Sequence, residues 1–368
     1  MTKNRLLSLD AFRGFTIALM IIVNDPGDWD NTFLTLLHAE WNGITIADFV
    51  FPFFIFIVGV SIVISQNNKG TTSSNYAIIF RSIKIFSLGV FLGFFGEFMN
   101  HVVSLGESIS LSDIRIPGVL QRIALVYLFC ALLYNYTSWF QQFSITLILL
   151  IGYYFVMEFI SVPGIGPGVL EPGKNLAAYV DSILIPGSMW KGTWDPEGLL
   201  STFPAIASGI IGMLAGHLII SKQTMEKKIV WMYFIGVFCL IDSFMWEWLM
   251  PINKNLWTST YVMYTSGWAF LMLASSIWIC DVLKYQSWLK PGIIFGSNSI
   301  AIYALSSLLV WFAYKFLDDN SLNSIVYGGM VNIGVYPKVA SLLWAIFYTF
   351  ICFVPAKYLY DKKIFLKL

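Results

Sequence analysis

The stretch from Asn24 to Ser61 reads NDPGDWDNTFLTLLHAEWNGITIADFVFPFFIFIVGVS, and its pattern predicts how the chain folds. An apolar run precedes it, about twenty polar and aromatic residues form its first part, and a second apolar run starts at Asp48. This alternation indicates two membrane-spanning helices joined by a short loop. His38 lies in that loop beside Glu40, and a histidine with a nearby carboxylate is placed to move a proton just outside the hydrocarbon.

Composition places the chain among integral membrane proteins. Of its 368 residues, 57% are hydrophobic and 12% are charged, whereas soluble domains carry roughly 25% charge. Apolar runs of about 17 to 25 residues, long enough to cross a bilayer as helix, recur ten times. We therefore predict an all-α, polytopic membrane protein that forms a single domain over 1–368, with spans near 8–24, 46–66, 76–99, 117–134, 143–161, 200–221, 229–250, 257–279, 292–316 and 337–357.

The distribution of lysine and arginine predicts that both termini are cytoplasmic. In that orientation, fifteen of the 22 basic residues fall on the inner side and seven on the outer side. The His38 loop and the polar segment 162–199 then lie on the outer side. Within this segment, NLAAYVDSILI has apolar residues at helical spacing, which predicts a helix along the outer surface. The N-terminal run has no small-residue cleavage site, so we expect no cleavable signal.

Several functional classes find no support in the sequence. The net charge of +1 gives no reason to expect nucleic acid as a partner. The four cysteines fall within or at the ends of apolar runs, so neither a disulfide nor a metal site is expected. There is no Walker loop, no dinucleotide-binding glycine motif, no HExxH and no GxSxG.

Three residues around the first loop are candidates for catalysis. His38 is either an ordinary surface histidine or a general base, and Asp48 or Glu40 could hold one of its ring nitrogens. Asn24 is either a helix cap or an amide that polarises a carbonyl oxygen beside His38. Asp48 is either a first-turn acid of the second span or part of the site.

Other polar residues in or near the spans could hold a charged ligand. Asp10 and Arg13 share a helix face. They form an ion pair with each other, or Arg13 binds a phosphate group of a ligand. RIPGVLQR places Arg115 and Arg122 two turns apart on the fourth span, and an arginine there needs an oxygen partner. DPEGLLST, residues 195–202, enters the sixth span with an acid-rich first turn. In GSNSI, Asn298 is expected to form a hydrogen bond between helices.

Taken in order, SLDAFRG, Asn24, HAEWNGITIADFVFPFFIFIVGVS, RIPGVLQR, DPEGLLST and GSNSI resemble the heparan-α-glucosaminide N-acetyltransferase family of transmembrane acyltransferases, from Arg5 onward. The resemblance, closest to a bacterial member, implies transfer of acetyl from cytoplasmic acetyl-CoA to the amine of a glucosamine-type sugar beyond a bacterial cytoplasmic membrane. The family's active-site histidine falls on His38 and its neighbouring asparagine on Asn24. The extra lumenal portion and span of the animal relatives are expected to be absent.

Transfer of acetyl from acetyl-CoA requires residues that bind the donor and the acceptor, and the sequence offers candidates for both. Acetyl-CoA is polyanionic, so its phosphates need cations at the inner face. The cofactor-binding candidates are Asp10, Arg13, Arg81, Lys84, Arg122 and Asn298, with Lys3, Arg5, Lys284 and Lys290 as further inner cations. The acceptor-binding candidates are Glu40, Trp41 and Arg115.

The mechanism and two other functions remain open at this stage. His38 acts as general base or as a transient acetyl carrier, and Arg122 is a second oxyanion donor beside Asn24. An O-acyltransferase of cell-envelope sugars and a transporter without chemistry are the competing functions. The expected partners are acetyl-CoA, an amino sugar and the bilayer, and a homodimer is left open.

Overall fold

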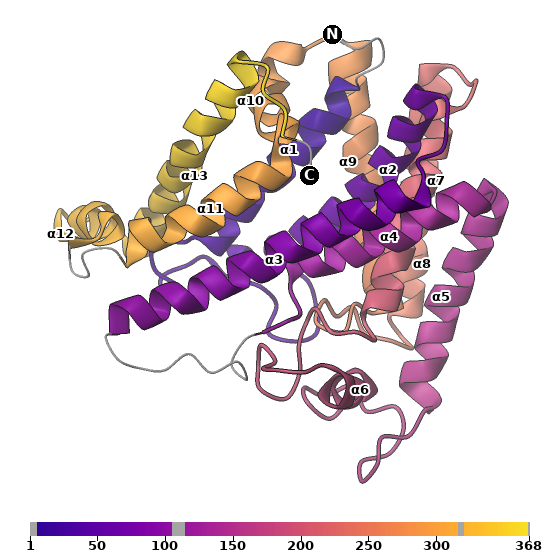
Figure 1. The fold of residues 1–368 in the computed structure, drawn as a ribbon, viewed down its shortest axis with the longest axis horizontal. Helices are drawn as coiled ribbons and strands as arrows, with labels where there is room; N and C mark the ends of the chain where they lie inside the picture. The colour runs from indigo at the N-terminus through magenta and orange to yellow at the C-terminus, as the bar shows by residue number, and fades with distance from the viewer. Residues whose placement is uncertain (1–5, 105–114, 316–319, 367–368) are drawn as a thin grey trace.

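The computed structural model describes residues 6–104, 115–315 and 320–366, and within these ranges the chain is a bundle of helices without β-strands (Figure 1). Nine helices in these ranges are long and apolar enough to cross a membrane, and one bent pair adds a tenth span. The all-α, polytopic prediction is therefore confirmed. The nine are α1 (Leu7–Asn24), α2 (Val50–Lys69), α3 (Asn75–Ser104), α4 (Val119–Tyr136), α5 (Trp139–Phe159), α7 (Thr202–Ile220), α8 (Met225–Trp246), α9 (Ser259–Ile277) and α13 (Pro337–Asp361).

The bent pair consists of α10 (Gln286–Ser297) and α11 (Ser299–Tyr314), which meet at an angle of 75°. The continuous span predicted at 292–316 is thus corrected: it begins inside α10 and is broken at Asn298, and residue 316 lies outside the described ranges. The Asn298 backbone departs from helical geometry (φ −133°, ψ 40°). Its side chain binds the C-terminal segment instead, accepting from Leu366 N at 2.8 Å and donating to Ile364 O at 2.9 Å.

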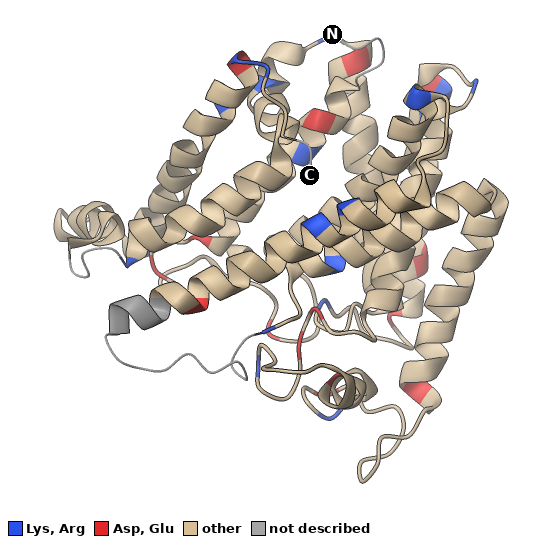
Figure 2. Cartoon of the chain, viewed as in Figure 1, with Lys and Arg blue, Asp and Glu red and all other residues tan. Residues whose placement is uncertain are grey.

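Short elements fill the connections between the spans. They are the 3₁₀ turns η1 (Leu34–Leu36) and η2 (Ile46–Phe49), the helices α6 (Leu176–Leu184) and α12 (Gly329–Asn332), and the π-helical turns η4 (Trp278–Val282) and η6 (Ser324–Gly328). The start of α1 and the C-terminal segment that binds Asn298 lie toward one end of the bundle, which we call the N/C end, whereas α6 lies at the opposite end, the α6 end (Figure 1). Most charged residues lie near these two ends, with basic positions on α3 and α4 between them (Figure 2).

Glycines bring the central helices into backbone contact. A Cβ on Gly59 of α2 would lie 1.9 Å from Gly209 O of α7, and one on Gly212 would lie 2.0 Å from Phe56 O. A Cβ on Gly296 of α10 would similarly lie 1.9 Å from Asp10 O of α1. Small residues are the usual means of close helix packing in membranes, where no hydrophobic force drives helices together. These contacts fix α1, α2, α7 and α10 around the centre of the molecule.

The segment 162–199 covers the α6 end. Asn175 caps α6 by accepting a hydrogen bond from Ala178 N at 2.9 Å, as its position before the apolar run indicates. Leu176 and Ala177 pack against Tyr153 and Met157 of α5. The helix predicted within NLAAYVDSILI is therefore present, and it brings the rest of the segment over the loop that carries His38.

Candidate active site

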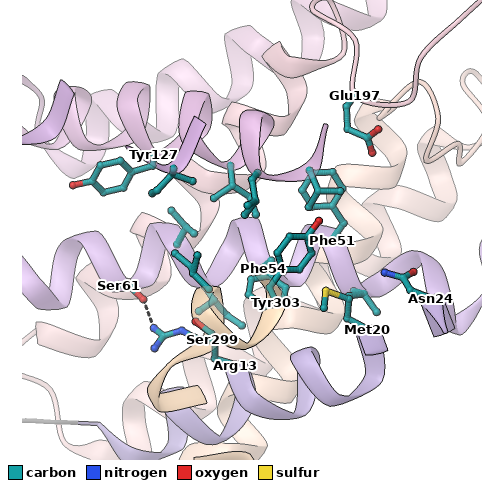
Figure 3. Close-up of a pocket in the computed structure, with 18 of the residues that line it drawn as sticks. Arg13, Met20, Asn24, Phe51, Phe54, Ser61, Tyr127, Glu197, Ser299 and Tyr303 are labelled. Carbon is teal, nitrogen blue, oxygen red and sulfur yellow. Dashed lines mark hydrogen bonds between the residues drawn. The ribbon is translucent and has the colours of Figure 1, made fainter. Parts of the chain in front are cut away.

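One cavity of about 1070 Å³ extends from the N/C end of the bundle to the α6 end. This volume exceeds the roughly 300–1,000 Å³ of ordinary small-molecule pockets. Figure 3 shows its length, with Tyr127 and the Arg13–Ser61 pair at one end, Phe51, Phe54 and Tyr303 in the middle, and Asn24 and Glu197 at the other end. The lining at the α6 end also includes Trp29, His38, Glu40, Arg115, Trp190, Trp194 and Lys254, and that at the N/C end includes Gln66, Lys69, Ser73, Arg81, Asn298 and Leu366.

His38 and Asp48 form a hydrogen-bonded pair at the α6 end of this cavity. Asp48 Oδ1 lies 2.7 Å from His38 Nδ1. The carboxylate is buried, whereas the imidazole is 44% exposed. An ionised carboxylate only accepts hydrogen bonds, so Nδ1 carries the proton of the neutral ring and Nε2 keeps its lone pair. Of the two acids that could hold His38, the structure places Asp48 on the ring, and this geometry suits a general base.

The local sequence explains why Asp48 is held so firmly. Its Oδ2 accepts from Thr45 N at 2.9 Å, Thr45 Oγ1 at 3.1 Å and Ala39 N at 3.1 Å. Thr45 and Asp48 thereby form a capping box that starts η2 and leads into α2. Tyr261 of α9 also donates to Asp48 O at 2.6 Å. Asp48 is thus both a helix-start acid and the anchor of His38, so its two candidate roles are compatible.

Lys254 completes this group, and sequence reasoning did not identify it. Its Nζ lies 2.9 Å from His38 Nδ1, 3.1 Å from His38 Nε2 and 3.5 Å from Asp48 Oδ1. Burial lowers the pKa of the Lys254 ammonium, while the Asp48 and Glu197 carboxylates oppose that shift. The sequence contained one signal: Lys254, in PINKNLW, is the single basic residue in the connection between α8 and α9, which returns to the same end as His38.

Asn24 is the last residue of α1 and lines the cavity at its α6 end. The C-cap position belongs to Asp25, so Asn24 is not the residue that caps the helix. No described residue takes up its side-chain amide in a hydrogen bond. In Figure 3 this side chain lies among the lining residues near Met20. The amide is therefore available to a ligand in the cavity.

The acceptor-side candidates have different surroundings. Glu40 is exposed and lines the cavity. Trp41 is outside the lining: its Nε1 donates to Leu170 O at 2.9 Å and its ring contacts Trp194, with centroids 5.0 Å apart. Trp41 thus fixes the segment 162–199 over the His38 loop, and Trp194 is the ring that faces the cavity.

Arg115 joins the acidic residues that the DPEG motif supplies. It donates from Nε and Nη2 to the two Asp195 oxygens at 2.7 and 2.6 Å, and it also pairs with Glu197. Although burial opposes ionisation of Asp195, Arg115 lowers the pKa of that carboxyl. The helix α7 begins only at Thr202, so the predicted role of these acids in its first turn is corrected. They bind Arg115, and Glu197 faces the cavity.

At the N/C end, Arg13 and Arg81 line the cavity. Arg13 donates to Ser61 Oγ at 2.6 Å and to Asp10 Oδ1 at 3.1 Å, so Asp10 acts through Arg13. The Arg81 guanidinium lies 4.8 Å from the centre of the Tyr127 ring. Lys84 is outside the lining, with its ammonium 4.6 Å from the Phe80 ring on an exposed face. Lys284 and Lys290 are also outside it, and Lys3 and Arg5 lie outside the described residues.

Two further candidates are occupied by the protein itself. Asn298 lines the cavity, but its amide holds the C-terminal segment as described above. Arg122 is fully buried outside the lining, donates to Gly198 O at 2.9 Å and to Ser201 Oγ, and lies 5.1 Å from the Trp257 ring centre. Within the described residues, no group of three His, Cys, Asp or Glu side chains is arranged to hold a metal ion.

The chain is similar to a family of known proteins. The family model described as heparan-alpha-glucosaminide N-acetyltransferase, catalytic, matches residues 5–241. The chain is 28% identical over 427 residues to the heparan-alpha-glucosaminide N-acetyltransferase of Mus musculus, an alignment that covers 100% of this chain and 61% of that protein. It is 29% identical over 425 residues to the Homo sapiens enzyme, covering 99% of this chain and 60% of the relative.

The chain therefore spans about three-fifths of the length of the curated relatives it matches. The family model covers well over half of the chain, and the matched residues include Asn24, His38 and Asp48. On this basis the chain belongs to the heparan-α-glucosaminide N-acetyltransferase family.

Proposed function

We propose that the chain is a transmembrane N-acetyltransferase, which moves acetyl from acetyl-CoA at the N/C end to the amine of a glucosamine-type sugar at the α6 end. The observation that carries this proposal is the single cavity that joins cations near one end of the bundle to the His38–Asp48 pair near the other. Residues from Arg13 to Leu366 line it. The chain therefore works as one catalytic unit in this proposal.

The orientation follows from charge. In the predicted topology, fifteen of the 22 lysines and arginines fall on the inner side, and basic residues favour the cytoplasmic side of a membrane. Acetyl-CoA is then drawn from the cytoplasm, and the acceptor is met on the outer face of a bacterial cytoplasmic membrane. The donor and acceptor reach the reacting centre from opposite sides, so neither needs to cross the bilayer.

The donor's chemistry fits the two parts of the cavity. Its phosphates would meet Arg81, Arg13 and Lys69, because guanidinium and ammonium groups are the usual partners of phosphate oxygens. Its slender pantetheine arm would run along the apolar walls that Phe51 and Phe54 form in Figure 3. The thioester would then lie near Asn24 and His38.

In the reaction that we propose, the amine nitrogen attacks the thioester carbon while His38 Nε2 removes a proton from that nitrogen. A C–N bond forms, and the carbonyl π electrons move to oxygen, where the Asn24 amide can donate a hydrogen bond. When the intermediate collapses, the C–S bond breaks with its electron pair on sulfur. The His38 imidazolium then returns the proton to the thiolate. The products are the N-acetyl sugar and CoA thiol.

The acceptor would bind at the α6 end. Trp29, Trp190 and Trp194 line this mouth together with the carboxylates of Glu40 and Glu197. Aromatic faces supply apolar contact area, and carboxylates attract the ammonium form in which an amino sugar arrives. This combination favours an amine acceptor over a neutral sugar. The ammonium releases one proton to the solvent, and the neutral amine then attacks as described above.

The proposal is tested with purified protein in liposomes. Labelled acetyl-CoA is supplied with glucosamine, other amino sugars and neutral sugars, and acetylated product is measured for the wild type and for His38→Ala. We expect acetylation of glucosamine that His38→Ala lowers by about 10²- to 10⁴-fold while CoA still binds. Acetylation of neutral sugars alone would identify an O-acyltransferase, and full activity of His38→Ala would overturn the assignment of the base.

A second measurement separates direct attack from an acetyl-histidine intermediate. The protein is incubated with acetyl-CoA without acceptor and examined by intact mass. A mass increase of one acetyl group that maps to His38 and disappears on addition of glucosamine would establish the covalent route. Release of CoA only when glucosamine is present supports direct attack, which is the route that we propose.

A further inference from the structure

Lys254 takes the place beside the reactive nitrogen of His38. Its Nζ lies 2.9 Å from Nδ1 and 3.1 Å from Nε2, the nitrogen that faces away from Asp48, and its side chain is 15% exposed toward the cavity. Because Nδ1 is engaged by Asp48, the lone pair that Lys254 can meet on the ring is that of Nε2. A charged donor therefore lies against the ring, within 3.1 Å of the nitrogen that has to accept the substrate proton.

The loop that presents Lys254 is fastened to the loop of His38. The buried Asn253 side chain donates to Asn42 Oδ1 at 3.0 Å and accepts from Leu256 N at 2.9 Å. Gly43 N also donates to Ile252 O at 2.8 Å. The bonds of Asn42 and Gly43 with Asn253 and Ile252 join the two loops next to the Lys254–His38 contact. The position of the ammonium is thus preorganised, as effective electrostatic catalysis requires.

Negative charges near Lys254 stabilise its ammonium group at this position. Asp48 lies 3.5 Å away, and Glu197 also acts electrostatically on Lys254. Three hydrogen bonds already occupy Asp48 Oδ2, so Asp48 is held as an anion whether or not Lys254 stays in place. The ammonium is therefore free to turn toward a new acceptor without leaving its counter-charges.

We propose that Lys254 donates a hydrogen bond to the thioester carbonyl oxygen of bound acetyl-CoA and stabilises the oxyanion that forms there. This inference rests on the proposed function. An amine that gives its proton to Nε2 lies within hydrogen-bond distance of it, and the attacked carbonyl oxygen lies only two bonds beyond the amine nitrogen. A donor within 3.1 Å of Nε2 reaches that oxygen by a change of side-chain torsion.

The proposal leaves the proton count of the reaction unchanged. Lys254 keeps its protons throughout, and His38 alone carries the proton from nitrogen to sulfur. Lys254 and Asn24 would share the oxyanion from two sides of the cavity. Turning toward the thioester also withdraws Lys254 from Nε2, so the base becomes available once the donor is bound.

The first test compares Lys254→Met, Lys254→Arg and, as a control, Lys174→Met, which alters a lysine at the same end of the bundle whose side chain is 61% exposed and paired with Glu171. Loss of one oxyanion donor typically costs about 10²- to 10³-fold in kcat. We expect that loss for Lys254→Met together with a KM for acetyl-CoA that rises about tenfold and an unchanged acceptor KM, partial activity for Lys254→Arg, and wild-type kinetics for Lys174→Met.

A pH series excludes the alternative that Lys254 only balances the charge of Asp48. Removing a positive charge changes protonation equilibria at the site, so the effect of a lost charge balance would be cancelled at high pH, whereas the loss of a hydrogen-bond donor would persist. We expect the high-pH plateau of kcat for Lys254→Met to stay about 10²- to 10³-fold low. A plateau that returns to the wild-type value would overturn the proposal.

A binding measurement addresses the carbonyl oxygen directly. S-ethyl-CoA has the same chain as acetyl-CoA but no carbonyl group, and both are titrated onto the protein without acceptor. A hydrogen bond to a charged group is worth about 1.5–3 kcal/mol, which corresponds to a tenfold or larger preference for acetyl-CoA. We expect Lys254→Met to lose this preference and Lys174→Met to keep it. If Lys254→Met kept the preference for acetyl-CoA, the inference about Lys254 would be overturned. The proposed function would still stand in that case, provided that His38→Ala is inactive.

Discussion

The two ends of the cavity are built differently. At the α6 end, His38 and Asp48 of one connection contact each other and Lys254 of a distant loop, while backbone amides hold the carboxylate. At the N/C end, Arg13 and Arg81 each contact residues of their own surroundings, Ser61 and Tyr127. The first arrangement is preorganised for bond making, where small displacements are costly. The second offers separate cations, which suits a ligand that must enter and leave.

Asp48→Asn is expected to have the largest effect on kcat, and it tests whether the α6 end is the part of the cavity where bonds are made. Three donors surround Oδ2, so the amide oxygen of asparagine will take that position and its NH₂ group will face His38 Nδ1. The ring must then place its own proton on Nε2 and loses the lone pair that accepts the substrate proton. A wrong histidine tautomer of this kind costs about 10⁴-fold in another enzyme class. We expect kcat to fall about 10³- to 10⁴-fold.

The control for this variant is CoA binding, measured by titration on the same preparation. Binding should be preserved, because the cations of the N/C end are remote from Asp48. A kcat within tenfold of the wild type would mean that Asp48 serves only as the capping residue of η2. A parallel loss of CoA binding would mean that the two ends of the cavity are not independent.

A smaller effect is expected from Asn24→Ala. The Asn24 amide is unengaged by described residues, so its removal breaks no contact in the empty site. If the amide donates to the oxyanion, kcat falls about 10²-fold, whereas the KM for acetyl-CoA changes little. Combined with His38→Ala, the loss should be less than the product of the two single losses, because both act on one intermediate. Strictly multiplicative losses would contradict a shared role.

Sequence reasoning identified the α6 end of the site better than the N/C end, and the difference is physical. His38, Asn24 and Asp48 lie within 25 residues, so a short loop brings them together and the pattern of spans places them at one end. Lys254 comes from a distant loop. Its contact with His38 depends on how α8 and α9 pack, and packing between helices leaves little trace in the polarity of one loop.

The N/C end shows a second limit. Arg81 and Lys84 are three residues apart on one helix, and nothing in their sequence distinguishes them as phosphate ligands. The structure turns Arg81 toward the cavity and Lys84 toward the Phe80 ring on the exposed face. Hydropathy also gave no indication of the break at Asn298, because the apolar residues of α10 and α11 form one continuous run. Hydropathy predicts how many spans there are, whereas neighbouring helices decide their direction and straightness.

Arg81 and Lys84 provide a matched pair of variants for testing the donor end of the cavity. In Arg81→Gln, a phosphate would lose a charge-assisted hydrogen bond worth about 1.5–3 kcal/mol. We expect the KM for acetyl-CoA to rise at least about tenfold, with kcat and the acceptor KM unchanged. Lys84→Gln removes the same charge from the same helix outside the cavity and should leave the donor KM within about twofold. Equal effects of both variants would indicate a general surface potential instead of a phosphate site.

The smallest effect concerns a carboxyl of the α6 end that takes no part in the bonded group. Asp25 is half-buried directly after α1, and burial raises its pKa to about 7. Between about pH 4 and pH 7, the folded protein keeps a proton on Asp25 that the unfolded chain has lost, so stability falls as pH rises through that window. Asp25→Asn should remove this dependence: its thermal midpoint in detergent should exceed the wild-type value by a few degrees at pH 8 and equal it at pH 4.

Asp30→Asn, which alters an exposed acid in the same loop, should shift the midpoint little at either pH. An equal gain for Asp25→Asn at both pH values would mean that the asparagine makes a new hydrogen bond, and that burial of the charge is not what costs stability at this position.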